Sequence, residues 1–300
     1  MRLFLSVILF FLCCFIVQAQ PASSRQKLAQ EQDSLQALGL RIVNDQVEPE
    51  RYNANYSFIK TLVNALKTPG SFNFPFDSLK TISIQPSGDG VFRVFSWHIL
   101  NDDGSYRYYG TIQMNKPDGK LQMFPLVDYT PSIKAAADTV TTNDKWYGAQ
   151  YYKVIPVTRN VRTPYYILLG WKGNTPKTTK KVIEVLSFKD GKAYFGMPVF
   201  DSDKERPNKQ RIIFEYSREA SMLLNYQQKE TMIVFDHLAP RNPEFKNNYE
   251  YYGPDFSYDG FKFINGRWRL TEDLVLKNSP TELDEQFNDP RNPGGKPRKL

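Results

Sequence analysis

The sequence predicts a mainly β fold, an antiparallel meander that forms a sandwich, barrel or propeller-like domain after a short helical N-terminal region. Turn signals such as Asp102-Asp103-Gly104, Pro117-Asp118-Gly119 and Asp190-Gly191 recur at short intervals between about Leu79 and Leu276. The runs between them are rich in Tyr, Phe, Val and Ile, which suit a pleated sheet. Short connections indicate antiparallel hairpins, because parallel pairs need long crossovers.

The expected helical region covers residues 20–70. Apolar residues recur there at spacings of three, four and seven, as one face of a helix requires, at Leu28, Leu35, Leu38 and Ile42. A second helix is expected from Glu48 to Lys67, with one side formed by Tyr56, Ile59, Val63 and Leu66. Thr68-Pro69-Gly70 should end it, because Pro lacks a donor and Gly tolerates positive φ.

The β domain is expected over residues 71–276. Its expected strands are 91–100, 106–115, 120–126, 149–157, 164–171, 181–188, 209–217, 221–227 and 231–236, with a hairpin over 260–270. Several strands are apolar on both faces, which indicates that the sheets are covered on both sides. Segment 130–145 is expected to be a short helix or a loop that crosses between strand groups.

Residues 1–19 have the pattern of a signal peptide. Arg2 precedes an apolar stretch from Leu3 to Val17, and the segment ends at Ala19 with small residues, as signal peptidase requires. The stretch is short for a membrane span, and no second apolar run of spanning length follows. We therefore expect an exported protein, periplasmic or secreted, with no transmembrane segment after cleavage.

The two cysteines, Cys13 and Cys14, lie inside this apolar stretch. Cleavage would leave a mature chain without cysteine, which excludes disulfides, a cysteine nucleophile and Cys-ligated zinc. Phe10-Phe11-Leu12 lacks the small residue that a lipobox requires before its cysteine, so lipidation is not expected.

The positive net charge is concentrated at the C-terminus. The chain carries +7, which falls to +6 without Arg2, and four of those charges lie among the last ten residues, at Arg291, Lys296, Arg298 and Lys299. Residues 277–300 are expected to be a disordered basic tail. The remaining chain gives no electrostatic reason to expect a nucleic-acid partner.

Three runs of the sequence resemble exported proteins of unknown function from Bacteroidota. They are Trp146-Tyr147-Gly148-Ala149, the run from Ile233 to Pro240, and the run from Tyr252 to Phe261. The resemblance implies a periplasmic or secreted location and carries no named activity.

Asp236-His237 could be half of a catalytic dyad. Adjacent residues of a strand point to opposite faces, so the pair meets only if a turn begins before Leu238. The alternative is an Asp at a loop edge beside a hydrogen-bonded His. His98, beside Trp97 in a strand, is expected to be a structural histidine.

Two carboxylates interrupt apolar strands, at Glu184 and Glu215. A desolvated carboxyl group has a raised pKa and can act as a general acid, while a second, ionised one acts as a base or nucleophile. The alternative is that each faces solvent or pairs with a neighbour such as Arg211.

We expect no cofactor and no metal site. Two histidines cannot form a three-His zinc site. Asp201-Ser202-Asp203-Lys204-Glu205 alternates oxygen ligands but lacks the central Gly of a calcium loop. Asp255 and Asp259 could fold around a cation, although Asp in turns mostly caps its own backbone.

Most of the abundant aromatic residues are expected in the core. The exception is a group among Gly, Pro and Asp at a loop edge, formed by Tyr251, Tyr252, Phe256 and Tyr258. Exposed rings serve as platforms in sugar- and peptide-binding β domains. With Asp255 and Asp259, these four are the candidate ligand-binding residues.

The leading hypothesis is therefore a non-catalytic binding or structural module of the cell envelope, whose partner is a glycan or an envelope protein. The alternative is a hydrolase of envelope polysaccharide that uses Glu184 and Glu215, with Asp236 and His237 as further catalytic candidates. The helical region could also dock the protein into an assembly. The sequence does not indicate an oligomeric state.

Overall fold

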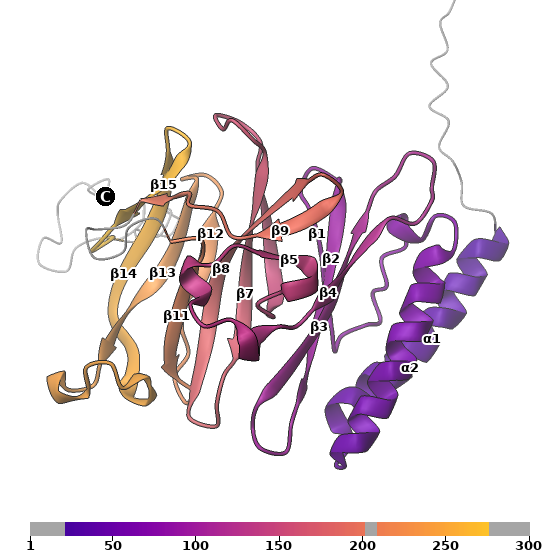
Figure 1. The fold of residues 1–300 in the computed structure, drawn as a ribbon, viewed down its shortest axis with the longest axis horizontal. Helices are drawn as coiled ribbons and strands as arrows, with labels where there is room; N and C mark the ends of the chain where they lie inside the picture. Colours follow the sequence, from indigo (N-terminus) through magenta and orange to yellow (C-terminus); the bar gives the residue numbers. More distant parts are fainter. Residues whose placement is uncertain (1–21, 202–208, 276–300) are drawn as a thin grey trace, which may run out of the picture. The chain divides into compact units, whose positions relative to one another are not determined.

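The computed structural model describes residues 22–201 and 209–275, which form two α-helices, several short 3-10 helices and three β-sheets (Figure 1). The expected signal peptide and C-terminal tail lie outside the described residues. The described residues form two compact units. Unit 1 contains residues 22–81 together with Gln113–Met123, and unit 2 contains Ile82–Ile112 and the described residues from Phe124 to Val275.

Unit 1 is built on α1 (Ala22–Asn44) and α2 (Glu48–Lys67), which lie side by side (Figure 1). Pro49 stands in the first turn of α2, where its missing N–H costs nothing. Gly70 follows the helix with φ +77°, so the chain turns there as expected. Leu28 and Leu35 are fully buried, as the helical spacing predicts.

The expected inner face of α2 is partly wrong. Tyr56 is 65% exposed, and Lys60 Nζ lies 5.3 Å from the centre of its ring. The apolar part of the buried face consists of Ala54, Phe58, Leu62, Ala65 and Leu66. Apolar residues occur on two overlapping stripes of this helix, and packing against α1 selects the stripe that contains Phe58.

The first sheet has four strands in the order β1-β2-β3-β4: β1 (Ser83–Pro86), β2 (Phe92–Leu100), β3 (Tyr106–Met114) and β4 (Met123–Val127). The crossover segment, residues 128–149, then carries three short 3-10 helices, at Thr130–Ser132, Ala136–Asp138 and Asn143–Lys145. A short strand, β5 (Thr141–Thr142), lies within it. Short helical turns at this crossing agree with the expectation for residues 130–145.

The second sheet has six strands. Five follow the order β5-β9-β8-β7-β6, with β6 (Gln150–Val157), β7 (Tyr165–Gly173), β8 (Thr178–Lys189) and β9 (Lys192–Phe195). The sixth, β11 (Ile212–Ser217), pairs with the first half of β8. All of these pairings are antiparallel.

The third sheet has the order β10-β15-β14-β13-β12, with β10 (Phe200–Asp201), β12 (Leu224–Gln227), β13 (Met232–Pro240), β14 (Tyr252–Ile264) and β15 (Arg267–Thr271). Only β10 pairs in parallel, with β15. Two 3-10 turns, Pro243–Phe245 and Tyr249–Tyr251, connect β13 to β14.

The main core of unit 2 lies between the second and third sheets. Ile167, Leu169 and Ile183 from the second sheet join Ile233 and Trp268 from the third in one buried cluster. The prediction of a mainly β, antiparallel fold is therefore confirmed. The described residues form three sheets and no closed barrel. Within those residues, no helix is long and apolar enough to cross a membrane.

Candidate functional site

A bulge in β14 lies opposite His237. The register between β13 and β14 shifts between Asp236, which faces Tyr258, and Leu238, which faces Pro254, so three residues of β14 lie opposite the single residue His237. Asp236 remains in the ladder opposite Tyr258, and its Oδ2 accepts a 2.7 Å hydrogen bond from the Leu223 N–H. The adjacent pair in the sequence therefore does not form a dyad.

His237 instead pairs across the strands with Asp259. The distance from His237 Nδ1 to Asp259 Oδ2 is 2.8 Å, and the Asp259 side chain is only 9% exposed. This hydrogen bond raises the pKa of His237 above its usual value. Asp259 Oδ1 also accepts a hydrogen bond from the Asp273 N–H, at 3.1 Å. The imidazole is 45% exposed, so its ring is held by one carboxylate and open to solvent.

Asp255 lies on the other side of the same imidazole. His237 Nε2 is 4.0 Å from Asp255 Oδ2, while Asp255 Oδ1 accepts hydrogen bonds from the N–H and hydroxyl of Ser257, at 3.1 and 2.7 Å. Phe256, between them, is 94% exposed and has φ +71°. This bulge of β14 thus carries an exposed ring in a backbone conformation that non-glycine residues rarely adopt.

A groove of about 530 Å³ opens where β14 begins. We call it the tyrosine groove. Its lining combines two aromatic rings, several charged side chains and the backbone of β13 and β14: Ser217, Glu219, Ala220, Ala239, Pro240, Arg241, Glu250, Tyr251, Tyr252, Gly253, Pro254 and Asp255. Three of these, Tyr251, Tyr252 and Asp255, are candidate ligand-binding residues from the sequence.

The two tyrosines of this groove are held by their neighbours. The Tyr251 ring stacks on Phe245, with 4.1 Å between ring centres and 19° between planes. The Tyr252 hydroxyl accepts a 3.0 Å hydrogen bond from the Asn247 N–H, and its ring centre lies 5.0 Å from that of Tyr249. Both rings are half-buried, so each presents part of its surface.

Apart from Asp255, the charged residues of the groove were not foreseen from the sequence. Glu250 forms an ion pair with Lys177 at 2.7 Å, and Arg241 is exposed in the loop after β13. With Glu219 and Asp255, the lining has three carboxylates and one guanidinium. Only the tertiary fold brings β11 and the β13–β14 loop together, so no local sequence signal could have found this set.

Glu184 lies in a different place, inside the second sheet. Its carboxylate is fully buried and accepts hydrogen bonds from Arg211 Nε at 3.0 and 2.8 Å. Burial raises the pKa of Glu184, and the bonds from Arg211 oppose that rise. Arg211 also donates to the carbonyl oxygens of Ala136, Thr139 and Phe195. This pair ties the crossover segment to the sheet and does not open into a cleft.

Glu215 lies four residues along β11 from Arg211 and has its own partners. It forms an ion pair with Lys180 at 3.1 Å and accepts 2.9 Å hydrogen bonds from Asn174 and Thr178. The register pairs Glu215 with Lys180 on β8. Glu184 and Glu215 therefore each have a separate cation, and neither lines the tyrosine groove.

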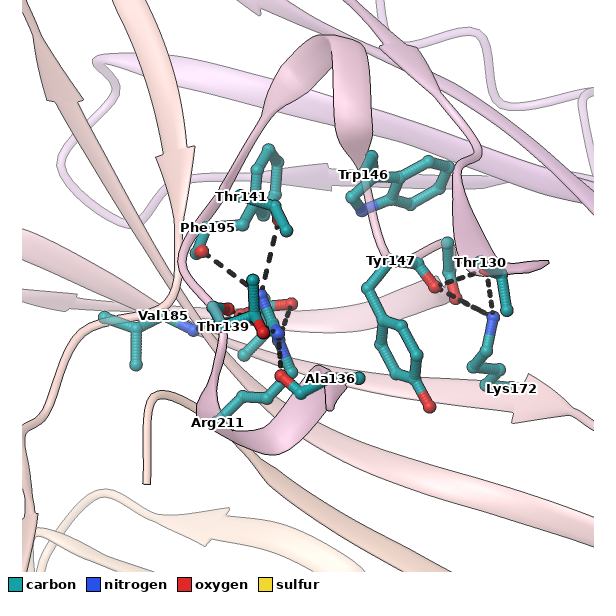
Figure 2. A network of polar contacts seen from close by, with 12 residues as sticks. Thr130, Ala136, Thr139, Thr141, Trp146, Tyr147, Lys172, Val185, Phe195 and Arg211 are labelled. Carbon is teal, nitrogen blue, oxygen red and sulfur yellow. Dashed lines mark hydrogen bonds and ion pairs between the residues drawn. The ribbon is translucent and has the colours of Figure 1, made fainter. Parts of the chain in front are cut away.

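A second buried cation, Lys172, holds the other end of the crossover segment. Its Nζ donates to Thr130 Oγ1, the Tyr147 carbonyl and the Gly148 carbonyl, at 2.9, 2.8 and 2.7 Å. The Tyr147 ring lies between the two cations, 4.6 Å from Lys172 Nζ and 5.5 Å from Arg211 (Figure 2). Burial lowers the pKa of Lys172 to about 7. Nothing in the sequence around Lys172 indicated this role.

The remaining candidates have structural surroundings. His98 Nδ1 lies 2.9 Å from Gln150 Oε1, and burial lowers the pKa of His98. Asp201 pairs with Arg267 and Arg269, whereas the rest of the run from Ser202 to Glu205 lies outside the described residues. Across the described part of the chain, no three His, Cys, Asp or Glu side chains are grouped to hold a metal ion.

Comparison of the chain with protein-family models, curated proteins and solved structures finds no match. What the tyrosine groove can bind is therefore argued from its side chains. Aromatic faces contact apolar C–H surfaces, and carboxylates accept hydrogen bonds from hydroxyl or ammonium groups. Such a lining suits a neutral or cationic ligand with both kinds of surface.

Proposed function

We propose that this protein is a non-catalytic binding module of the cell envelope, exported by its N-terminal signal, and that it binds a glycan in the tyrosine groove. One observation carries the proposal. Tyr251, Tyr252 and Asp255, which the sequence alone singled out, line one groove of about 530 Å³. That volume lies within the range of roughly 300–1,000 Å³ usual for small-molecule sites.

The chemistry of the lining favours a neutral glycan. A sugar ring presents an apolar C–H face and a rim of hydroxyl groups, which match half-buried tyrosines beside carboxylates. Lys177 compensates the charge of Glu250, and the remaining carboxylates, Glu219 and Asp255, still outnumber Arg241, so the lining disfavours an acidic polysaccharide.

The groove is also pre-organised. The stack of Tyr251 on Phe245 and the hydrogen bond to the Tyr252 hydroxyl fix both rings without a ligand. A site whose side chains are already ordered loses less conformational entropy when it binds.

The test is binding of the whole chain to a panel of neutral glycans, such as laminarin, mannan, cello-oligosaccharides and chito-oligosaccharides, by isothermal titration calorimetry. Tyr252→Ala and Asp255→Ala should each weaken binding about tenfold, because contacts at the centre of a site contribute roughly 1–3 kcal/mol. Tyr56→Ala, at a 65% exposed ring on α2, is the matched control and should leave the affinity unchanged.

Two results would overturn the proposal. One is that no glycan of the panel binds the folded chain. The other is that Tyr56→Ala and Tyr252→Ala weaken binding equally. If instead a basic peptide binds and only Asp255→Ala weakens it, the ligand of the groove is a protein.

A further inference from the structure

A second groove, also of about 530 Å³, lies at the opposite end of β14 from the tyrosine groove. We call it the basic groove. Asn265 and Gly266, the turn after β14, form one side, and the loop between β6 and β7 forms another. Its apolar lining consists of Val161, Tyr165, Phe188, Met197 and Val199.

The floor of the basic groove belongs to the main core. Tyr165 and Val199 are 2% and 7% exposed, and both are members of the buried cluster between the second and third sheets. Val161 and Met197 pack against the same cluster. Trp268 Nε1 donates a 3.1 Å hydrogen bond to the Tyr165 hydroxyl, which fixes that ring. The apolar surface is therefore rigid, with room above it.

The rim of the basic groove is cationic. Arg162 and Lys189 line it, both are exposed, and the lining contains no Asp or Glu. Lys189 lies directly opposite Lys192 in the hairpin between β8 and β9, and like charges at facing positions destabilise a sheet. Asp190, in the turn between the two lysines, is the neighbouring acid on that hairpin. A bound anion would reduce this repulsion.

The two loops that frame the basic groove contact each other. A Cβ placed on Gly266, which has φ +82°, would lie 2.7 Å from the Asn160 carbonyl oxygen. Asn160 itself has φ +58°. Only glycine fits at position 266, so the shape of the groove depends on this backbone contact and exists before any ligand arrives.

From these observations we propose that the basic groove binds an amphipathic anion, a single acyl chain with a carboxylate head group. The chain would lie on Val161, Phe188 and Met197, which are half-buried and lie beside the buried Tyr165 and Val199. The head group would pair with Arg162 and Lys189. Arginine and lysine form charge-assisted hydrogen bonds with carboxylates, and buried apolar surface supplies the rest of the affinity. This site is separate from the tyrosine groove and adds a second ligand class to the proposed function.

The experiment titrates the whole chain with laurate below its micelle concentration, by calorimetry. Arg162→Glu with Lys189→Glu should weaken binding about tenfold or more, because attraction becomes repulsion. The matched control carries Lys229→Glu with Lys262→Glu, the same charge change at two exposed positions that do not line the groove. The control should bind laurate like the unchanged chain.

Two further ligands and one further variant separate the parts of the proposal. Butyrate should bind far more weakly than laurate, because it buries less chain, and dodecyltrimethylammonium should not bind in the groove. Thr163→Trp, at an exposed lining position, should block the groove and weaken laurate binding. Equal losses in both charge variants, equal binding of laurate and the ammonium compound, or unchanged binding in Thr163→Trp would overturn the proposal.

Discussion

His237 and Asp259 join neighbouring strands through a 2.8 Å contact, although twenty-two residues separate them in the chain. A bulge in β14 lies opposite His237, between the ladder pairs Asp236–Tyr258 and Leu238–Pro254. The contact between His237 and Asp259 connects β13 to the part of β14 that follows the tyrosine groove, and it makes this region sensitive to pH.

The raised pKa of His237 predicts that its contribution to stability decreases as pH rises. Below about pH 6.5, the usual pKa, histidine is charged in both the folded and unfolded states, and its stabilisation is fully present. As pH rises through the higher folded pKa, the proton and the ion pair with Asp259 are lost. His237→Gln should make the free energy of unfolding, measured by urea denaturation, depend less on pH between pH 6 and pH 8. An unchanged pH dependence in that variant would contradict the assignment.

Because Glu184 and Arg211 form a buried ion pair, replacing either residue alone should lower the free energy of unfolding substantially. Glu184→Gln or Arg211→Met leaves one uncompensated charge in the interior, which costs about 3–5 kcal/mol of unfolding free energy. Glu184→Leu combined with Arg211→Met should recover part of that loss. Glu215→Gln is the comparison variant, because the Glu215 side chain is 23% exposed and should lose less stability than the fully buried pair. Chemical denaturation of the four proteins at pH 7 distinguishes these cases.

The lowered pKa of Lys172 predicts that its contribution to stability changes with pH in the direction opposite to that of His237. Its folded pKa of about 7 lies below the unfolded value, so between these values the unfolded chain binds more protons and stability rises with pH. Lys172→Met should reduce that slope between about pH 7.5 and 9.5, below the range in which tyrosines ionise. Urea unfolding at several pH values measures it, and an identical slope in both proteins would contradict a lowered pKa.

The positive φ of Phe256 predicts that a glycine at this position stabilises the protein. Its positive φ strains a non-glycine residue by roughly 1–2 kcal/mol, and a ring that is 94% exposed has few contacts to lose. A glycine costs about 0.5–1 kcal/mol more on folding than another residue, because its unfolded state has more conformational entropy. The relief of strain outweighs this cost, so Phe256→Gly should stabilise the protein by about 0.5 kcal/mol. Phe256→Val, which is β-branched, should destabilise. Thermal unfolding of both variants gives the comparison, and the reverse order would show that the ring has a stabilising contact.

The long elements could be predicted because their patterns are local. The run from Glu48 to Lys67 is a helix with the expected bounds, and the runs near β2, β3, β7 and β13 are strands. The short strands β1, β5, β9 and β10 were not predicted. Each has two to four residues and exists only because a longer strand lies beside it.

The residues of the candidate site could also be predicted in part from the sequence. His237, Asp255 and Asp259 could be singled out, but their contacts could not, because a bulge changes which residues face each other without a reliable sequence signal. The partner of Glu184 illustrates the same limit. Along the chain Arg211 is closer to Glu215, whereas pairing of β11 with β8 places it opposite Glu184.

The contacts of Arg211 also determine when the crossover segment can become ordered. Arg211 binds the carbonyls of Ala136 and Thr139, which precede it in the chain by 75 and 72 residues. During translation the crossover segment and Glu184 are therefore synthesised before Arg211, the cation that binds both. Until β11 has been synthesised and has paired with β8, the Glu184 carboxylate has no counter-ion and the segment lacks this attachment. Ordering of this region should therefore be a late step in the maturation of the chain.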